Sequence, residues 1–330
     1  MDPRNKELTD KIQKVQKCKR SSARTYASTL RRLGNEFRGQ GKGFTKDLSW
    51  VHNKNILEKI KKYQSTVNVK RNLVNGMIIG LKIRPNKVLS DAYNEYLQKL
   101  NTDVDNLAKS GELTEKQQAR WLTWQKIVGL RRLLARKVRL SQAYKRAKLN
   151  SKDFKLISQY FILCLYTLTS PVRNDWALVT FHSVKGFENI GQRDANYLVQ
   201  RKSGYQVYWN QYKTSKKYKE VVLDIPKNLE KIIRKHIKYL KKWFPDNNRL
   251  LLNSRFEPMS RISLTKFLQS MFFSYFRKKI GTSHIRTIFL SHKYSHKEDE
   301  ARKKVAREML HSEETQQKFY VKEKKDEPGV

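Results

Sequence analysis

The chain has 330 residues, with 71 lysines and arginines against 30 aspartates and glutamates, which gives a formal net charge of +41. This charge predicts a polyanionic partner, but electrostatics alone does not rank nucleic acid above an anionic membrane surface or an RNA–protein assembly. Hydrophobic residues make up 38% of the chain, enough for a core, so a merely disordered basic tail is excluded.

Helical patterns fill the first hundred residues. From Ser21 to Phe37, apolar side chains recur every three or four positions, as on one face of an amphipathic helix. The opposite face carries four arginines, Arg24, Arg31, Arg32 and Arg38. A basic face is usually only solvated, but in a chain as basic as this one we expect these arginines to contact phosphates. Further helices are expected over residues 55–63, 67–81 and 90–108.

A linker is predicted near residues 109–116, where turn-forming residues precede a helix N-cap at Thr114. We therefore divide the chain into a helical domain, residues 1–110, and a second domain, residues 111–330, since this length suggests about two domains. In the second domain, helices are expected over residues 121–140 and 153–168.

The pattern changes between Asn196 and Ile225, where alternating and β-branched residues are typical of strands. Three antiparallel strands are expected there, separated by turns at 202–204 and 213–218. Helices resume from Asn228 to the end. The predicted fold class is therefore mainly α with a small antiparallel β-sheet.

The cysteines and the hydropathy pattern bear on where the protein works. Cys18 and Cys164 lie far apart, so neither a disulfide framework nor a cysteine-based zinc site is expected. No apolar stretch approaches the roughly 20 residues of a membrane span, and the N-terminus lacks the apolar core of a signal peptide. We therefore expect a soluble, intracellular protein without a membrane partner.

Two arginines stand in distinctive settings. Arg173 follows a long apolar helix, and Arg286 lies in the segment 281–290. A guanidinium can hold two phosphate oxygens at once, which a lysine cannot do. Taken alone, however, Arg173 is more simply explained as a solvated side chain in a helix-capping turn.

The remaining candidates lie in a hairpin turn and near the C-terminus. The turn over residues 212–220 carries Lys213, Lys216 and Lys217, which by themselves indicate only a solvated tip. Further on, His311 and Tyr320 are nine positions apart. One tyrosine among sixteen is usually a core or surface residue, so only its place in a series gives it meaning.

Such a series exists. The segments around five candidates resemble the catalytic boxes of the tyrosine recombinase, or phage integrase, family, and they stand in the same order along the chain. The five candidates are Arg173, Lys213, Arg286, His311 and Tyr320. The resemblance covers about residues 115–320, and the helices over 21–37 and 67–81 look like the family's core-binding domain. The segments 121–124 and 170–175 are most similar to recombinases of large DNA viruses, virophages and eukaryotic mobile elements.

Some positions depart from the family's pattern. Met309-Leu310 replaces the more usual Leu-Gly before the histidine. Ser283 stands three positions before the second arginine, where the family commonly has a histidine, and His284 is adjacent. Asp175 stands near the place where many members have a glutamate. The resemblance implies support roles for Asp175 and for Ser283 or His284, although a core-edge or exposed imidazole explains His284 better.

The resemblance implies a helical core-binding domain and a recombinase catalytic domain that together clamp double-stranded DNA. Tyr320 would attack the scissile phosphate to form a 3′-phosphotyrosyl link, while Arg173 and Arg286 hold its oxygens. His311 would assist, and Lys213 would protonate the leaving 5′ oxygen. No metal, cofactor or ATP is expected, and the basic residues Lys216 and Lys217 would bind DNA together with the four arginines of the first domain.

The family also acts as a homotetramer on DNA, with a dimer at each site, so we expect recombination or integration inside the cell, in the nucleus or wherever viral or host DNA lies. A type IB topoisomerase shares these residues and this chemistry, but the helical N-terminal half argues against it. A catalytically inactive DNA-binding protein of the same fold is the other alternative, and the complete set of five residues argues against that. His292 and His296 could share a helix face as metal ligands, but surface histidines explain them better.

Overall fold

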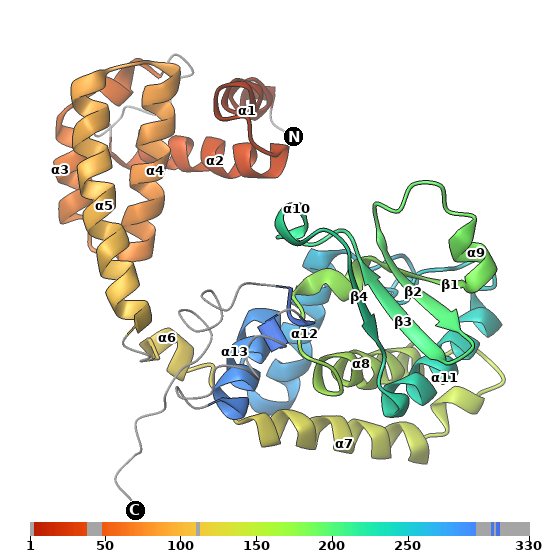
Figure 1. Ribbon diagram of the computed structural model, residues 1–330. Coiled ribbons are helices and arrows are strands. Elements are labelled where there is room, and N and C mark those ends of the chain that lie inside the picture. The colour runs from red at the N-terminus through yellow and green to blue at the C-terminus, as the bar shows by residue number, and fades with distance from the viewer. Residues whose placement is uncertain (1–2, 38–47, 110–112, 295–304, 307, 311–330) are drawn as a thin grey trace, which may run out of the picture. The chain divides into compact units, whose positions relative to one another are not determined.

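The computed structural model describes residues 3–37, 48–109, 113–294, 305–306 and 308–310 (Figure 1). The chain divides into two compact units, residues 1–110 and 111–330, each with its own hydrophobic core. The chain is mostly helical with one small sheet, so the prediction of a mainly α fold with a small sheet is confirmed. No helix of the described residues is both long and apolar enough to cross a membrane.

The described part of the first unit is helical. Its helices are α1 (Pro3–Gln16), α2 (Arg20–Phe37), the 3-10 helix η1 (Ser49–His52), α3 (Asn55–Lys62), α4 (Val67–Ile83) and α5 (Lys87–Lys109). Two glycines of α4 allow close packing of its neighbours. A Cβ on Gly76 would lie 2.7 Å from Cγ2 of Thr29, and a Cβ on Gly80 would lie 2.9 Å from Cγ1 of Val51. Larger residues at these positions would push α2 and η1 away from α4.

The sheet of the second unit has four strands in sequence order: β1 (Val179–Ser183), β2 (Asn196–Arg201), β3 (Gly204–Trp209) and β4 (Val221–Asp224). The pairs β2–β3 and β3–β4 are antiparallel, as expected. The prediction of a three-stranded, purely antiparallel sheet is wrong, because β1 pairs with β2 in parallel. β1 has only five residues and directly follows a short 3-10 helix, so its alternation is too brief to stand out in the sequence.

The connection from β1 to β2 includes the short helix α9 (Val184–Glu188) and has its own small apolar cluster. The ring of Phe187 packs on Tyr197 and Tyr208 of the sheet, with ring centroids 5.4 and 4.6 Å apart. The guanidinium of Arg193 lies 4.3 Å above the Phe187 ring. This connection is therefore held against the sheet by contacts of its own, apart from the main core.

The second unit is completed by α6 (Glu115–Gln118), α7 (Trp124–Leu140), η2 (Ala143–Lys145), α8 (Ser151–Thr167), η3 (Asn174–Leu178), α10 (Ser215–Tyr218), α11 (Lys227–Trp243), α12 (Arg261–Phe276) and α13 (Thr282–Lys293). The predicted N-cap is confirmed, since Thr114 and Gln117 form a capping box at α6. The expectation of helices from Asn228 onward is wrong over residues 244–260. That stretch is non-helical and contains an isolated bridge between Leu252 and Pro258.

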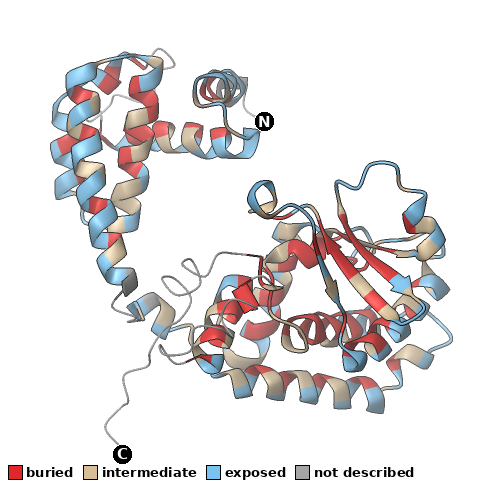
Figure 2. Ribbon diagram, in the orientation of Figure 1, coloured by how far each residue is buried: buried red, intermediate tan, exposed pale blue. Residues whose placement is uncertain are grey.

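Helix α8 forms the middle of the second unit's core, as the buried residues in Figure 2 show. Every residue from Phe161 to Tyr166 is buried, which explains why this half of the helix carries no charged residue in the sequence. Helices α7 and α11 pack against it. Because α8 is fixed on several sides, the loop that begins at its C-terminal end starts from a rigid point.

The turn between β2 and β3 requires glycine at its end. Gly204 has a φ of 144°, and a Cβ there would lie 1.8 Å from Oε1 of Glu230, which accepts a hydrogen bond from Tyr205 N. We expect Gly204→Ala to lower the free energy of unfolding by about 2 kcal/mol or more in a denaturant titration. Gly129→Ala, in open space on α7, should leave it unchanged or raise it by up to about 1 kcal/mol. Equal effects would contradict this account.

A buried histidine makes the second unit sensitive to acid. His236 of α11 stacks on Phe161 with ring centroids 3.6 Å apart, and its Nε2 donates to Leu250 O at 3.1 Å. Its Nδ1 has no hydrogen-bond partner, and burial lowers the pKa of His236 to about 3. Protonation therefore favours the unfolded chain, where the imidazole has an ordinary pKa near 6.5.

The free energy of unfolding should accordingly fall as the pH drops from about 6.5 to about 3, with up to about 5 kcal/mol of the loss due to His236. A His236→Gln variant keeps a hydrogen-bond donor but lacks this titration. The stability advantage of the unsubstituted protein over His236→Gln, measured by denaturant unfolding, should shrink across that pH range. An advantage that stays constant would exclude this role for the buried imidazole.

Candidate functional site

Arg173 lies in the loop between α8 and η3. The hydroxyl of Tyr166, a buried residue of α8, donates to Arg173 O at 2.7 Å and fixes the backbone of the loop. The Arg173 side chain is half-buried, and its Nη1 lies 3.5 Å from Leu310 O. The rigid end of α8 therefore fixes the backbone position from which the Arg173 side chain extends.

Arg286 lies in the second turn of α13, and its side chain is fully buried. Its Nη2 lies 3.4 Å from Met309 O. The amide of Asn174 joins α13 to the Arg173 loop, because its Oδ1 accepts from the hydroxyl of Thr282 at 3.0 Å. The same amide donates to the hydroxyl of Thr265 on α12 at 2.8 Å. Asn174 therefore links the two arginine-bearing segments.

Lys213 lies between β3 and α10. Its side chain is exposed and makes no hydrogen bond or ion pair with the residues that the structure describes. Its neighbours are held more firmly. The hydroxyl of Tyr212 donates to Lys219 O at 2.8 Å, and the hydroxyl of Thr214 donates to Leu310 O at 2.8 Å. The turn thus fixes the backbone at Lys213 and leaves the ammonium group accessible.

These three parts of the chain meet at residues 309–310. Both arginines and the hydroxyl of Thr214 face carbonyl oxygens of this segment. The next residue is His311, which, like Tyr320, lies outside the described residues. The structure therefore brings two predicted arginines and the turn of the predicted lysine to the segment that leads into the other two site residues.

Asp175 adds a buried carboxylate to this group of cations. Only 5% of its side chain is exposed, and Nη2 of Arg261 donates to its Oδ1 at 2.8 Å. Burial raises the pKa of Asp175, and Arg261, followed by Arg173 and Arg286, acts against that rise. The carboxylate therefore offsets part of the repulsion among the guanidiniums around it.

Two residues that the sequence did not single out hold the end of β3. Asn196, fully buried at the start of β2, accepts from Asn210 N at 3.0 Å and from Gln211 N at 2.7 Å, and donates to Gln211 O at 3.1 Å. Arg261 also donates to Gln211 O, at 2.7 Å. No local pattern predicts these contacts, because Arg261 lies 50 positions from Gln211 and 86 positions from Asp175.

The predicted support residues Ser283 and His284 lie in the first turn of α13. Ser283 is exposed and His284 is half-buried. Burial, together with the charge of Arg120, lowers the pKa of His284, so its imidazole is neutral near pH 7 and adds no cation to the site. Lys216 and Lys217 are exposed on α10, close in sequence to Lys213.

Three of the four arginines predicted to bind phosphates lie on α2: Arg24, Arg31 and Arg32. Arg38 is outside the described residues. Arg32 already has partners within its unit, with Nε 2.8 Å from a carboxylate oxygen of Glu36 and Nη2 2.9 Å from the hydroxyl of Tyr63. A phosphate contact by Arg32 would therefore compete with these bonds, although Arg32 and Arg24 are both exposed.

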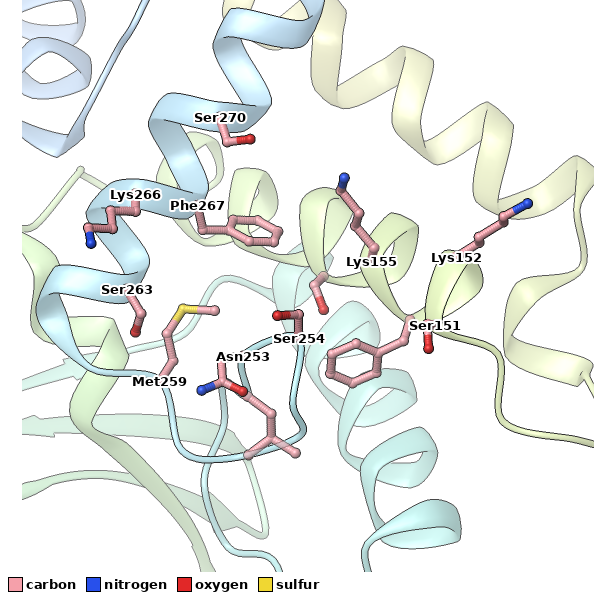
Figure 3. Close-up of a pocket in the computed structure, with 13 residues that line it drawn as sticks. Ser151, Lys152, Lys155, Asn253, Ser254, Met259, Ser263, Lys266, Phe267 and Ser270 are labelled. Carbon is pink, nitrogen blue, oxygen red and sulfur yellow. The ribbon is translucent and has the colours of Figure 1, made fainter.

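A cavity of about 550 Å³ lies between α8, α12 and the loop over residues 252–259 (Figure 3). Phe267 and Met259 line it with apolar surface, and Lys152, Lys155 and Lys266 stand at its rim. None of the predicted site residues lines this cavity. Three lysines do not single out a binding site in a chain with 71 lysines and arginines. Within the described ranges, no group of three or more histidine, cysteine or acidic side chains could hold a metal ion.

Comparison with known proteins gives few similarities to this chain. No family model and no curated protein matches the chain. The structure is similar to that of XerA recombinase, with a TM-score of 0.37 and 11% sequence identity, over 95% of this chain and 93% of that chain. A likeness of this degree does not establish a family.

Proposed function

We propose that the protein is a DNA strand transferase of the tyrosine recombinase type. It would cleave and rejoin double-stranded DNA through a covalent 3′-phosphotyrosyl link to Tyr320, without metal or ATP. The observation that carries the proposal is the meeting of Arg173, Arg286 and the Lys213 turn at residues 309–310, directly before His311. These segments are far apart in the sequence, and a phosphate-cleaving site requires such groups to be gathered before the substrate arrives.

In the proposed reaction, the hydroxyl oxygen of Tyr320 attacks the scissile phosphorus while the bond to the 5′ oxygen breaks. Arg173 and Arg286 stabilise the charge on the non-bridging oxygens. Lys213 gives a proton to the leaving 5′ oxygen, and the tyrosine's proton passes to His311 or to water. One phosphodiester is exchanged for another, so a DNA 5′ hydroxyl can later attack the phosphotyrosine and release Tyr320 without ATP.

The two arginines differ in how readily they could reach a phosphate. Arg173 is half-buried, whereas Arg286 is fully buried, with Met309 O beside its Nη2. A phosphate contact by Arg286 therefore requires the chain that covers it, including Met309, to shift. Charge-assisted hydrogen bonds to phosphate are stronger than bonds to neutral carbonyls, which favours that exchange when DNA binds.

The proposed partner is double-stranded DNA, and a net charge of +41 suits extended contact with its phosphates. Reciprocal exchange breaks both strands of each of two duplexes, and each protomer supplies one tyrosine. We therefore propose a homotetramer on DNA, with a dimer at each site. Recombination or integration of a viral or other mobile DNA element, inside the cell where that DNA lies, is the role that this chemistry would serve.

Tyr320→Phe should abolish the covalent protein–DNA adduct and leave DNA affinity nearly unchanged, because only the nucleophilic oxygen is removed. The adduct is measured on denaturing gels with nicked duplexes from the DNA that flanks the coding sequence, in the presence of EDTA, and mapped by peptide analysis. Tyr294→Phe, at a buried position, serves as the control and should retain the adduct. Undiminished adduct with Tyr320→Phe would overturn the proposal.

Binding to DNA should weaken steeply with salt. A clamp that neutralises on the order of eight phosphates gives a slope near −7 in a plot of log affinity against log salt concentration. Fluorescence anisotropy with a labelled duplex over a range of salt concentrations measures this slope. A slope shallower than about −3 would mean that the positive charge serves mainly another purpose.

Lys213→Ala should cleave ordinary DNA about a hundredfold more slowly or worse, because an alkoxide leaves poorly without a proton. A 5′-bridging phosphorothiolate leaves without that proton, so Lys213→Ala should cleave it at close to the normal rate. Arg173→Ala should be slow on both substrates. Lys216→Ala and Lys217→Ala are the matched controls. If the phosphorothiolate restored cleavage by one of these variants and not by Lys213→Ala, that lysine would be the general acid.

A further inference from the structure

The backbone just before Lys213 is held from two sides. The buried amide of Asn196 binds both Gln211 N and Gln211 O, and Nη2 of Arg261 lies 2.7 Å from the same Gln211 O. That nitrogen also lies 2.8 Å from Oδ1 of Asp175. This one nitrogen donates to both Gln211 O and Asp175 Oδ1. Arg261 therefore joins the Lys213 turn directly to the loop that carries Arg173, which lies two residues before Asp175.

The setting of Arg261 differs from that of an ordinary surface ion pair. Its side chain is 42% exposed, but the carboxylate that it binds is only 5% exposed. Arg261 is the first residue of α12, and Thr265, one turn later, binds Asn174 at 2.8 Å. The helix that carries Arg261 is thus hydrogen-bonded to the Arg173 loop. The Arg261 side chain is therefore fixed at its backbone by this helix and at its guanidinium by Asp175 and Gln211.

We propose that Arg261 is a positioning residue that holds the turn carrying Lys213 at a set place relative to Arg173. The inference rests on the function proposed above. In that reaction Lys213 protonates the 5′ oxygen of the same phosphate whose non-bridging oxygens Arg173 holds. The two groups must therefore match the dimensions of one phosphate, and a misplacement of about 1 Å can cost about a hundredfold in rate.

Two simpler roles for Arg261 predict different behaviour. If Arg261 only bound a DNA phosphate, its loss would weaken DNA binding and slow cleavage whatever the leaving group. If it only neutralised Asp175, its loss would leave an unpaired buried carboxylate that could draw Arg173 or Arg286 away from the phosphate. The defect would then lie in the arginine clamp, and a better leaving group would not repair it.

The leaving group separates these roles. Arg261→Ala should cleave ordinary DNA about tenfold to a hundredfold more slowly, and a 5′-bridging phosphorothiolate at close to the normal rate, with DNA affinity nearly unchanged. Arg255→Ala, which removes an exposed arginine six positions earlier, is the matched control and should be normal on both substrates. An equal defect of Arg261→Ala on both substrates would overturn the proposal.

A double variant removes the effect of the unpaired carboxylate. In Arg261→Ala with Asp175→Asn, no buried charge is left to attract the clamp arginines. The double variant should still be slow on ordinary DNA and restored by sulfur, because the bond to Gln211 O is missing. Asp175→Asn alone keeps an oxygen that Arg261 can bind but removes the charge that offsets the guanidiniums, so its defect should lie in the arginine clamp and should not be repaired by sulfur. If the double variant regained normal cleavage of ordinary DNA, neutralisation of Asp175 would be the role of Arg261.

Hydrogen exchange tests the structural part without relying on cleavage. Arg261→Ala should speed amide exchange in the peptide over residues 210–219 and leave the hairpin over 197–208 unchanged, while Arg255→Ala should alter neither. Unchanged exchange over 210–219 would overturn the positioning role even if cleavage slowed. Faster exchange in a protein that forms no adduct on any substrate would instead reject the proposed function while retaining the tie between Arg261 and the turn.

Discussion

A buried carboxylate organises the candidate site. The side chain of Asp175 is 5% exposed, and a charge in that position is costly unless a cation reaches it. Arg261 supplies the cation from the first residue of α12, at 2.8 Å. This requirement aligns α12 with the loop that follows α8. Asn174, the residue before Asp175, adds hydrogen bonds to α12 and α13, so three segments are fixed by two consecutive residues.

The same carboxylate explains how several guanidiniums can gather in a chain that is already strongly basic. Arg261, Arg173 and Arg286 all act on the pKa of Asp175, and without this anion their mutual repulsion would favour a more open arrangement. The carbonyl oxygens of residues 309–310 supply further partial negative charge to Arg173 and Arg286. A phosphate in this place would add a second anion, so the proposed binding of DNA would further reduce the repulsion among these guanidiniums.

The sequence predicts the parts of this structure that depend on local patterns. Apolar residues that recur every three or four positions identify most helices, and alternation of apolar and polar residues identifies the three antiparallel strands. The N-cap of α6 is predicted from Thr114. The five-residue strand β1 is missed because its alternation is brief and begins directly after a short 3-10 helix. Arg173 and Arg286 are found through a family resemblance, but Arg261 is not, since nothing local marks it among 71 lysines and arginines. Its role depends on acceptors 50 and 86 positions away.

The connection between β1 and β2 has a practical consequence. Phe187 and Arg193 hold it on the sheet through a cluster separate from the main core, and the parallel register of β1 with β2 is set by the strands themselves. Most of residues 188–194 are exposed, and none of them binds the residues around Asp175. Chain length can therefore change here at little cost to the site, which makes this connection a suitable place to insert a fluorescent or affinity tag.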